Sequence, residues 1–263
     1  MEQSYQRPKF SFLVLDYYNE EGARICLESI KRNNLNNYPV IYLDNGAFDK
    51  DYPNKFYQEG LIDTLIRHKN GLGGGCGQTD LYRFAESEYL AFVQSDQVLN
   101  YQLSEIEIDY FISLLNNGFD CIDLNGDQSQ RGRWTDRAHI VKTDFINSLA
   151  PFPNGGPGKL HHLRWNENYL QEVFDKRGNK IAHIKPTIFI DNGRISIREN
   201  PDGSKWKHHP DTKQLWLISG PVKEKYIYPN FTDEEIQEVI RTQYWEPGKI
   251  PELEKKHSFR VWN

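Results

Sequence analysis

Short apolar runs and amphipathic stretches alternate along the first hundred residues of the chain. Residues 10–15 (FSFLVL), 40–43 (VIYL) and 89–93 (YLAFV) have the length and apolar character of buried strands. Between the first two runs, residues 23–30 place apolar side chains at i, i+3, i+4 and i+7, the spacing of one apolar helix face. Strands that alternate with helices in this way predict an α/β fold with a mainly parallel sheet flanked by helices.

Further signals extend this order of elements. Residues 61–66 favour a third short strand, and residues 78–86 favour a helix after a run of glycines. Ser104 and Glu107 form the S-x-x-E pattern of a capping box, which opens a helix that runs to Leu115.

A second group of elements is expected in the following part of the chain. Residues 119–124 are strand-like, and residues 165–174 have helical character that ends before Gly178. Residues 181–190 (IAHIKPTIFI) predict one strand, in which Pro186 favours a sheet edge or a bend.

The composition limits the class of protein. The chain has 263 residues and a net charge of −5, from 32 Lys and Arg against 37 Asp and Glu. Aromatic residues make up 13% of the chain, and this content together with the small net charge excludes an intrinsically disordered protein. The length fits one large domain, or one domain with an extension. No apolar run approaches the roughly 20 residues of a membrane-spanning helix.

The sequence also bears on compartment and partners. The N-terminal residues MEQSYQRP contain no secretory signal, and Cys26, Cys76 and Cys121 form no C-x-x-C pair. We therefore expect reduced thiols in a cytoplasmic chain. The acidic balance argues against extensive binding to a nucleic acid backbone, although the basic and aromatic residues at 131–137 and 205–209 leave a local basic groove open.

Polar residues follow the ends of three predicted strands. They are residues 16–19 (DYYN), 44–46 (DNG) and 94–97 (QSDQ). Because ligands of open α/β sheets bind at the carboxyl ends of the strands, we expect these residues to converge in space.

The order of these segments resembles that of GT-A-type glycosyltransferases, in particular the family-2-like group. Residues 15–20 (LDYYNE) are similar to the family's P-x-Y-N-E, and residues 40–47 (VIYLDNGA) to its second strand, whose final acid contacts the uracil or ribose. Residues 88–97 (EYLAFVQSDQ) resemble the strand with the metal-binding D-x-D, and residues 167–186 resemble the E-D helix and the strand after it.

The resemblance implies a domain organisation. Residues 1–200 would form a GT-A-like, Rossmann-type catalytic domain, with the donor half at about 1–100 and the acceptor half at about 101–200. Residues 201–263 are expected to form a C-terminal extension that packs on the same domain.

The chain departs from the family pattern at two places. Gln94-Ser95-Asp96 stands where the family has D-x-D, so only the second acid, a ligand of the Mg or Mn ion in the family, is retained. The amide of Gln94 is still able to hydrogen-bond ribose or a metal-bound water. The E-D pair reads Glu167-Asn168 and keeps the Glu that would act as the base.

Glycosyl transfer has two chemical requirements that these acids would meet. A divalent cation held by oxygen ligands neutralises the leaving diphosphate, and a carboxylate accepts the proton of the attacking hydroxyl. The resemblance assigns the first task to Asp96 and the second to Glu167. Without it, Asp96 is equally a turn residue, and Glu167 an acid that stabilises a helix N-terminus.

The glycine run at residues 70–77 (NGLGGGCG) permits close approach of the backbone to a phosphate, but it satisfies neither G-x-G-x-x-G nor a P-loop. The resemblance places this run beside the donor nucleotide, and a surface turn is the alternative.

The donor-site candidates are Asp16, Tyr17, Asp44, Gly73, Gly74, Gln78, Gln94 and Ser95. His208 or His209 would complete the metal shell of Asp96, as a histidine beyond the catalytic helix does in GT-A enzymes, or bind the diphosphate.

The resemblance thus implies a glycosyltransferase that depends on Mn or Mg and moves a sugar from a nucleotide diphosphate sugar, expected to be UDP-linked, to an acceptor hydroxyl. Glu167 as base would invert the anomeric centre. The resemblance does not identify the acceptor, so a glycan, another hydroxyl compound and a modified nucleic acid base all stay open. Two alternatives remain: a sugar-phosphate nucleotidyltransferase, whose glycine signature residues 72–78 resemble, and a non-catalytic nucleotide-sugar-binding module, which the missing acid at Gln94 suggests.

Overall fold

The computed structural model describes residues 7–69, 74–125, 134–153, 166–185 and 187–191, together with four short strands at 198–199, 205–208, 215–219 and 260–262. Its elements follow one another in the order β1 (Phe10–Asp16), α1 (Glu20–Asn33), β2 (Val40–Asp44), α2 (Tyr52–Gln58), β3 (Thr64–Arg67), α3 (Gly74–Arg83), β4 (Tyr89–Gln94), β5 (Gln97–Leu99), α4 (Glu105–Asn116), β6 (Cys121–Asp123), β7 (His139–Lys142), α5 (Thr143–Asn147), α6 (Asn166–Arg177), β8 (Ile181–Lys185), β9 (Phe189–Asp191), β10 (Arg198–Glu199), β11 (Lys205–His208), β12 (Leu215–Ser219) and β13 (Arg260–Trp262).

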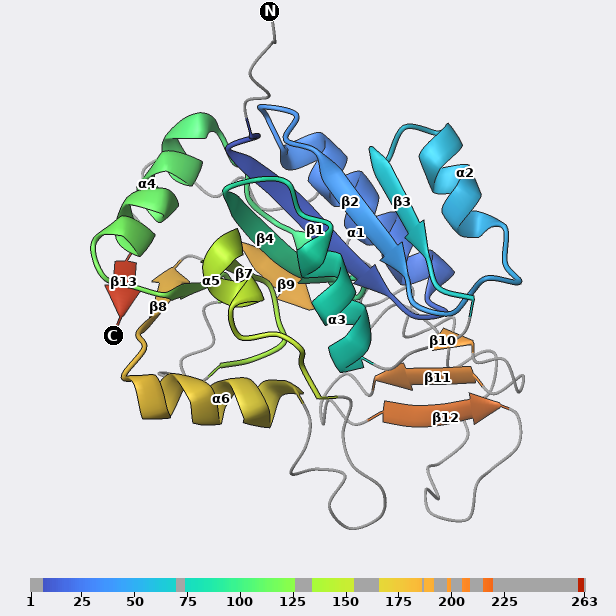
Figure 1. The fold of residues 1–263 in the computed structure, drawn as a ribbon. Coiled ribbons are helices and arrows are strands. Elements are labelled where there is room, and N and C mark those ends of the chain that lie inside the picture. Colours follow the sequence, from blue (N-terminus) through green and yellow to red (C-terminus); the bar gives the residue numbers. More distant parts are fainter. Residues whose placement is uncertain are drawn as a thin grey trace, which may run out of the picture.

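An eight-stranded sheet in the order β13-β8-β6-β7-β4-β1-β2-β3 forms the centre of the molecule (Figure 1). Strands β4, β1, β2 and β3 are parallel to one another, and β6 is parallel to β8. Strand β7 runs antiparallel to both of its neighbours, and β13 runs antiparallel to β8. The predicted mainly parallel sheet with flanking helices is confirmed, and the antiparallel strands β7 and β13 are additions that the apolar pattern did not reveal.

Helices cover both faces of this sheet (Figure 1). On one face, α1, α2 and α4 pack against alternate strand residues such as Phe12, Val14 and Tyr42. On the other face, α3, α5 and α6 pack against the intervening residues, such as Leu13 and Leu43. Because both faces are covered, the parallel strands are apolar almost throughout.

Two predicted elements differ from the structure. Helix α3 begins at Gly74, four residues before the predicted start at Gln78, inside the glycine run. Residues 181–190 do not form one strand, since β8 pairs with β6 and β13, whereas β9 pairs with β5 in a separate two-stranded sheet. Pro186, which lies outside the described residues, separates the two, and proline cannot donate a hydrogen bond within a continuous strand.

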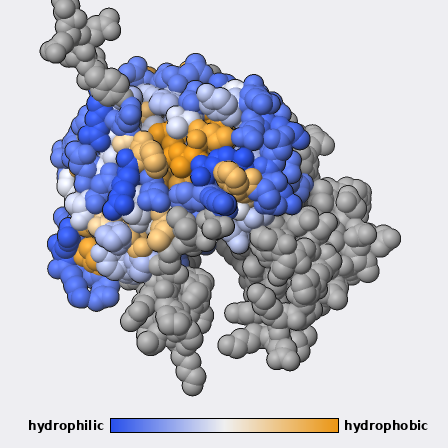
Figure 2. Space-filling view, turned by 45° about the vertical axis from the view of Figure 1, so that its right-hand side comes forward, coloured by the Kyte–Doolittle hydropathy of each residue, from blue (hydrophilic) through white to orange (hydrophobic). Residues whose placement is uncertain are grey.

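The other predicted elements are present. The capping box at Ser104 and Glu107 opens α4, and Gly178 ends α6 with a φ of +65°. All three cysteines are free thiols, as expected. None of the helices within the described ranges has the length and apolar character needed to cross a bilayer. The coloured part of the face in Figure 2 is largely hydrophilic, with hydrophobic residues gathered near its centre and a smaller group at the lower left.

Candidate functional site at the carboxyl ends of the parallel strands

The carboxyl ends of β1, β2 and β4 bring the predicted polar residues to one edge of the sheet. Asp16 lies directly opposite Asp44 in the β1–β2 register, and Leu15 lies opposite Gln94 in the β1–β4 register. The segments that follow these strands are therefore neighbours, as the α/β order of elements led us to expect.

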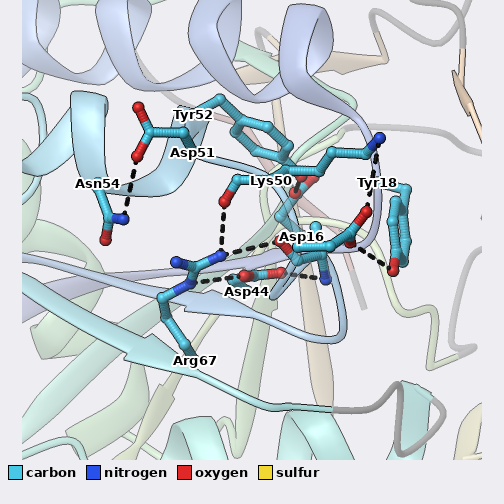
Figure 3. A network of polar contacts seen from close by, with 10 residues as sticks. Asp16, Tyr18, Asp44, Lys50, Asp51, Tyr52, Asn54 and Arg67 are labelled. Atoms are coloured by element: carbon cyan, nitrogen blue, oxygen red, sulfur yellow. Dashed lines mark hydrogen bonds and ion pairs between the residues drawn. The ribbon is translucent and has the colours of Figure 1, made fainter.

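Asp44 is fully buried and holds the loop after β2 in place. Its Oδ1 accepts from the backbone N–H of Ala47 at 2.6 Å, and its Oδ2 accepts from Arg67 Nε at 2.9 Å (Figure 3). The pKa of Asp44 is raised above its ordinary value, because burial outweighs the opposing effects of Arg67 and the Ala47 N–H. Arg67 also donates to the carbonyls of Ala47 and Lys50, each at 2.8 Å, so one guanidinium ties β3 to this loop.

Asp16 is 1% exposed, and its two carboxylate oxygens differ. Oδ2 accepts from the hydroxyl of Tyr52 at 2.6 Å (Figure 3), whereas Oδ1 has no hydrogen-bond partner among the described residues. Burial and the charge of Asp16 raise the pKa of Tyr52, so this phenol stays protonated as a donor. A buried acceptor without a partner suits a bound ligand or an ordered water.

The segment after β1 is conformationally unusual. Tyr18 has a positive φ of 50°, which costs about 1–3 kcal/mol for a residue other than glycine. Its hydroxyl donates to Asp49 at 3.1 Å, and its ring meets that of Tyr17 edge to face, with centroids 5.0 Å apart. Tyr17 is 37% exposed and therefore able to contact a ligand.

Asn19 lies directly before α1, but its side chain does not cap the helix. Its Nδ2 instead donates to Ser95 Oγ at 3.5 Å, and its buried Oδ1, like Asp16 Oδ1, lacks a partner among the described residues. Ser95 is 5% exposed, and its N–H donates to the carbonyl of Leu15. The turn that carries Asp96 is thus attached to the end of β1.

Asp96 lies half-buried in the turn between β4 and β5. The thiol of Cys26 lies beneath the turn and donates weakly to the carbonyl of Gln94 at 3.8 Å. Burial and the charges of Asp96 and Asp16 raise the pKa of Cys26, which keeps it a neutral thiol.

Gln94 and Glu167 are connected through a residue that the sequence did not single out, Asp136. Gln94 Nε2 donates to Asp136 Oδ2 at 2.7 Å, and the backbone N–H of Asp136 donates to Glu167 Oε1 at 3.0 Å. Burial raises the pKa of Asp136 well above its ordinary value, and the Glu167 carboxyl beside it raises that pKa further.

The glycine run contributes a helix start. Gly75 and Gly77 lie where a Cβ would meet the Pro153 carbonyl oxygen at 2.1 Å and Asn45 Nδ2 at 2.8 Å, whereas a Cβ on Gly74 would meet nothing within 4 Å. Gln78 is fully buried, and its amide donates to the Tyr82 hydroxyl at 3.0 Å. Gly73, His209 and the side chain of His208 lie outside the described residues.

The oxygen chemistry of this edge fits a hard divalent cation that is shared with a substrate. Among the described residues, no three His, Cys, Asp or Glu side chains are arranged to hold an ion by themselves. Mg²⁺, however, is usually held by one or two carboxylates together with waters and substrate phosphates. The half-buried carboxylate of Asp96 meets that requirement.

Three functional candidates were missed from the sequence. Arg67 is the last residue of a short strand, so the rule that polar residues past strand ends line the site would have found it. Tyr52 and Asp136 carry no such signal, because their positions depend on how α2 and the 134–138 segment pack.

Comparison with known proteins finds a curated relative and solved structures that share the fold. No protein-family model matches the chain. A curated relative, "Putative glycosyltransferase EpsH" of Bacillus subtilis (strain 168), is 24% identical over 199 residues, which is 70% of this chain and 55% of that protein. The chain therefore spans about half the length of this relative.

Solved structures of TarS from S. aureus share the fold. One matches 69% of this chain and 36% of its own, with a TM-score of 0.52 and 17% identity. The complex of TarS 1–349 with UDP matches 69% of this chain and 59% of its own, with a TM-score of 0.51 and 18% identity. The complex with UDP-GlcNAc has a TM-score of 0.50. The predicted resemblance is thereby confirmed, and the chain is built on the fold of the GT-A-type glycosyltransferases.

Proposed function

We propose that this chain transfers a sugar from a UDP-linked donor to an acceptor hydroxyl. What supports the proposal is the convergence of Asp16, Asp44 and Asp96 at the carboxyl ends of neighbouring parallel strands, with Glu167 linked to the same edge through Asp136. The relative named as a glycosyltransferase and the TarS complexes with UDP and UDP-GlcNAc point to the same chemistry.

The donor nucleotide would bind between the loops after β1 and β2. Asp16 Oδ1 and Asn19 Oδ1 are buried acceptors without partners among the described residues, and they match the N–H of a uracil or the hydroxyls of a ribose. Tyr17 offers a partly exposed ring for stacking. Asp44 would act chiefly by fixing the loop, since both of its oxygens already accept hydrogen bonds.

In the transfer step, the acceptor hydroxyl oxygen forms a bond to the anomeric carbon. The bond from that carbon to the diphosphate oxygen breaks, and its electron pair leaves with the diphosphate. Glu167 accepts the hydroxyl proton, and attack from the face opposite the leaving group inverts the anomeric centre. Mg²⁺ or Mn²⁺, when bound at Asp96, would neutralise the charge of the diphosphate.

The proposal is tested by UDP calorimetry with and without Mn²⁺, followed by assay of UDP release from UDP-GlcNAc. We expect Mn²⁺ to tighten UDP binding in the wild-type protein and not in Asp96→Asn. Glu167→Gln should keep UDP binding but lower transfer by about 10²–10⁴-fold. Glu172→Gln, five residues farther along α6 and exposed beside Lys176, is the matched control and should stay active.

Each outcome discriminates. If UDP binds neither with nor without Mn²⁺, the proposal of a UDP-linked donor is refuted. If Glu167→Gln and Glu172→Gln transfer sugar at the same rate, the assignment of Glu167 as the base is refuted. UDP binding without any turnover would favour the non-catalytic binding module. Release of pyrophosphate from UTP and a sugar 1-phosphate would favour the nucleotidyltransferase. Glycans, other hydroxyl compounds and nucleic acids are the acceptors to screen.

A further inference from the structure

The segment at residues 134–138 is fixed to one face of α6. The backbone N–H of Trp134 donates to Gln171 Oε1 at 2.5 Å, and that of Asp136 donates to Glu167 Oε1 at 3.0 Å. Glu167 and Gln171 are four residues apart, so they lie on the same side of the helix. The buried Trp134 ring packs on Phe174, one turn farther along, with ring centroids 4.9 Å apart. This anchoring determines where the Asp136 side chain points.

The Asp136 carboxyl then connects two elements that are distant in sequence. Its Oδ2 accepts from Gln94 Nε2 at 2.7 Å, at the end of β4, and the carboxyl also meets that of Glu167 on α6. Gln94 occupies the position at which the resembled family has an acid. An acid there would place a third carboxyl group beside Asp136 and Glu167, whereas the amide supplies a donor.

Two carboxyl groups form a hydrogen bond only when one of them carries the proton. Burial raises the pKa of Asp136 well above its ordinary value, which makes Asp136 the protonated partner and Glu167 the acceptor. A protonated carboxyl offers one donor and one acceptor, the same pair that an asparagine amide offers.

We propose that Asp136 is a positioning residue for glycosyl transfer: it receives the Gln94 amide on one side and directs the Glu167 carboxylate toward the acceptor on the other. This inference rests on the proposed function, in which Glu167 is the base. It also accounts for the chain's departure from D-x-D, because the neutral amide at 94 and the acid at 136 form a complementary pair.

The test compares kcat and the donor KM for UDP-GlcNAc in the wild-type protein, Asp136→Ala, Asp136→Asn and Gln94→Glu. We expect Asp136→Ala to lower kcat by roughly 100-fold, the effect of a misdirected catalytic group, with donor KM within about twofold of wild type. Asp136→Asn, which preserves both hydrogen bonds, should restore kcat to within about threefold of wild type. Gln94→Glu should lower kcat as Asp136→Ala does.

A merely structural role would lower kcat and raise donor KM together, and would not distinguish Asn from Ala. An unchanged kcat in Asp136→Ala, or an Asp136→Asn protein as slow as Asp136→Ala, overturns the proposal. Crystal structures of the wild-type protein and both variants provide a readout without turnover. Glu167 should keep its rotamer in Asp136→Asn and change it in Asp136→Ala, and an unmoved Glu167 in Asp136→Ala also overturns the proposal. If the wild-type protein transfers no sugar and Glu167 still moves as expected, the positioning contact stands and the proposed function fails.

Discussion

Arg67 compensates the charge of Asp44 where no solvent reaches it: the guanidinium Nε lies 2.9 Å from Asp44 Oδ2, and the Asp44 side chain is completely buried. The same guanidinium binds two loop carbonyls and lies over the ring of Phe48, 5.0 Å from its centroid. The pair therefore couples the end of β3 to the loop that would border the donor nucleotide.

Arg67→Ala should lower the free energy of unfolding by about 3–5 kcal/mol, because it leaves a buried carboxylate without a counter-charge. Urea unfolding at neutral pH measures this. The pKa of Asp44 is already raised by burial, and removal of Arg67 raises it further, so the variant should regain stability as the pH falls and the carboxyl takes up a proton. Arg24→Ala, which breaks an exposed ion pair with Glu59, is the control and should cost about 1 kcal/mol or less. Equal losses in the two variants would contradict the assignment.

Close approach of the backbone at Gly75 gives a second prediction. A Cβ there would lie 2.1 Å from the Pro153 carbonyl oxygen, so Gly75→Ala must displace the 152–153 segment and should destabilise the protein by about 1–3 kcal/mol. Gly74→Ala has open space around the new methyl group and should be neutral or slightly stabilising, since alanine favours helices over glycine. Thermal unfolding of the two variants decides, and a Gly75→Ala protein as stable as Gly74→Ala would contradict the structure.

These glycines also show why part of the fold was not predictable. The parallel strands were recognisable because burial on both faces makes β1, β2 and β4 continuous apolar runs. Helix α3 starts among glycines, which disfavour helices, because its first turn packs closely against Pro153 and Asn45. That contact is tertiary, and local propensity carries no trace of it.

The candidate site divides in the same way. Asp16, Asp44 and Gln94 directly follow predicted strands, so their convergence followed from the topology of a parallel sheet. Asp136 reaches Gln94 only because β7 returns antiparallel between β4 and β6, and the segment before it is anchored on α6. No spacing in the sequence encodes that arrangement.

A buried chain of hydrogen bonds at His139 predicts a pH dependence of stability. His139 Nδ1 lies 2.7 Å from the Arg137 carbonyl, which only accepts, so Nδ1 carries the proton and Nε2 accepts from the Tyr82 hydroxyl at 3.0 Å. Burial lowers the pKa of His139 to about 4, below the roughly 6.5 of the unfolded chain.

Between these two values the unfolded state binds a proton that the folded state does not. The His139 contribution to stability is therefore complete above about pH 6.5 and is lost as the pH falls toward 4, on the order of 3 kcal/mol. Urea unfolding from pH 7.5 to 4.5 should show a smaller decline in His139→Gln than in the wild-type protein. Parallel declines would mean that His139 is protonated in the folded state.

The unequal oxygens of Asp16 separate a structural role from a binding role. Oδ2 is held by the Tyr52 hydroxyl, while Oδ1 has no partner among the described residues. Asp16→Asn removes the charge and should weaken UDP binding by about 10–100-fold in calorimetry, the range of one hydrogen bond to a charged group. Tyr52→Phe removes only the contact at Oδ2, so it should reduce stability by about 1–3 kcal/mol and leave a smaller effect on UDP affinity. Asp109→Asn on the exposed side of α4 is the control for loss of one negative charge. If Asp16→Asn and Asp109→Asn bind UDP equally well, Asp16 serves the fold and the nucleotide lies elsewhere.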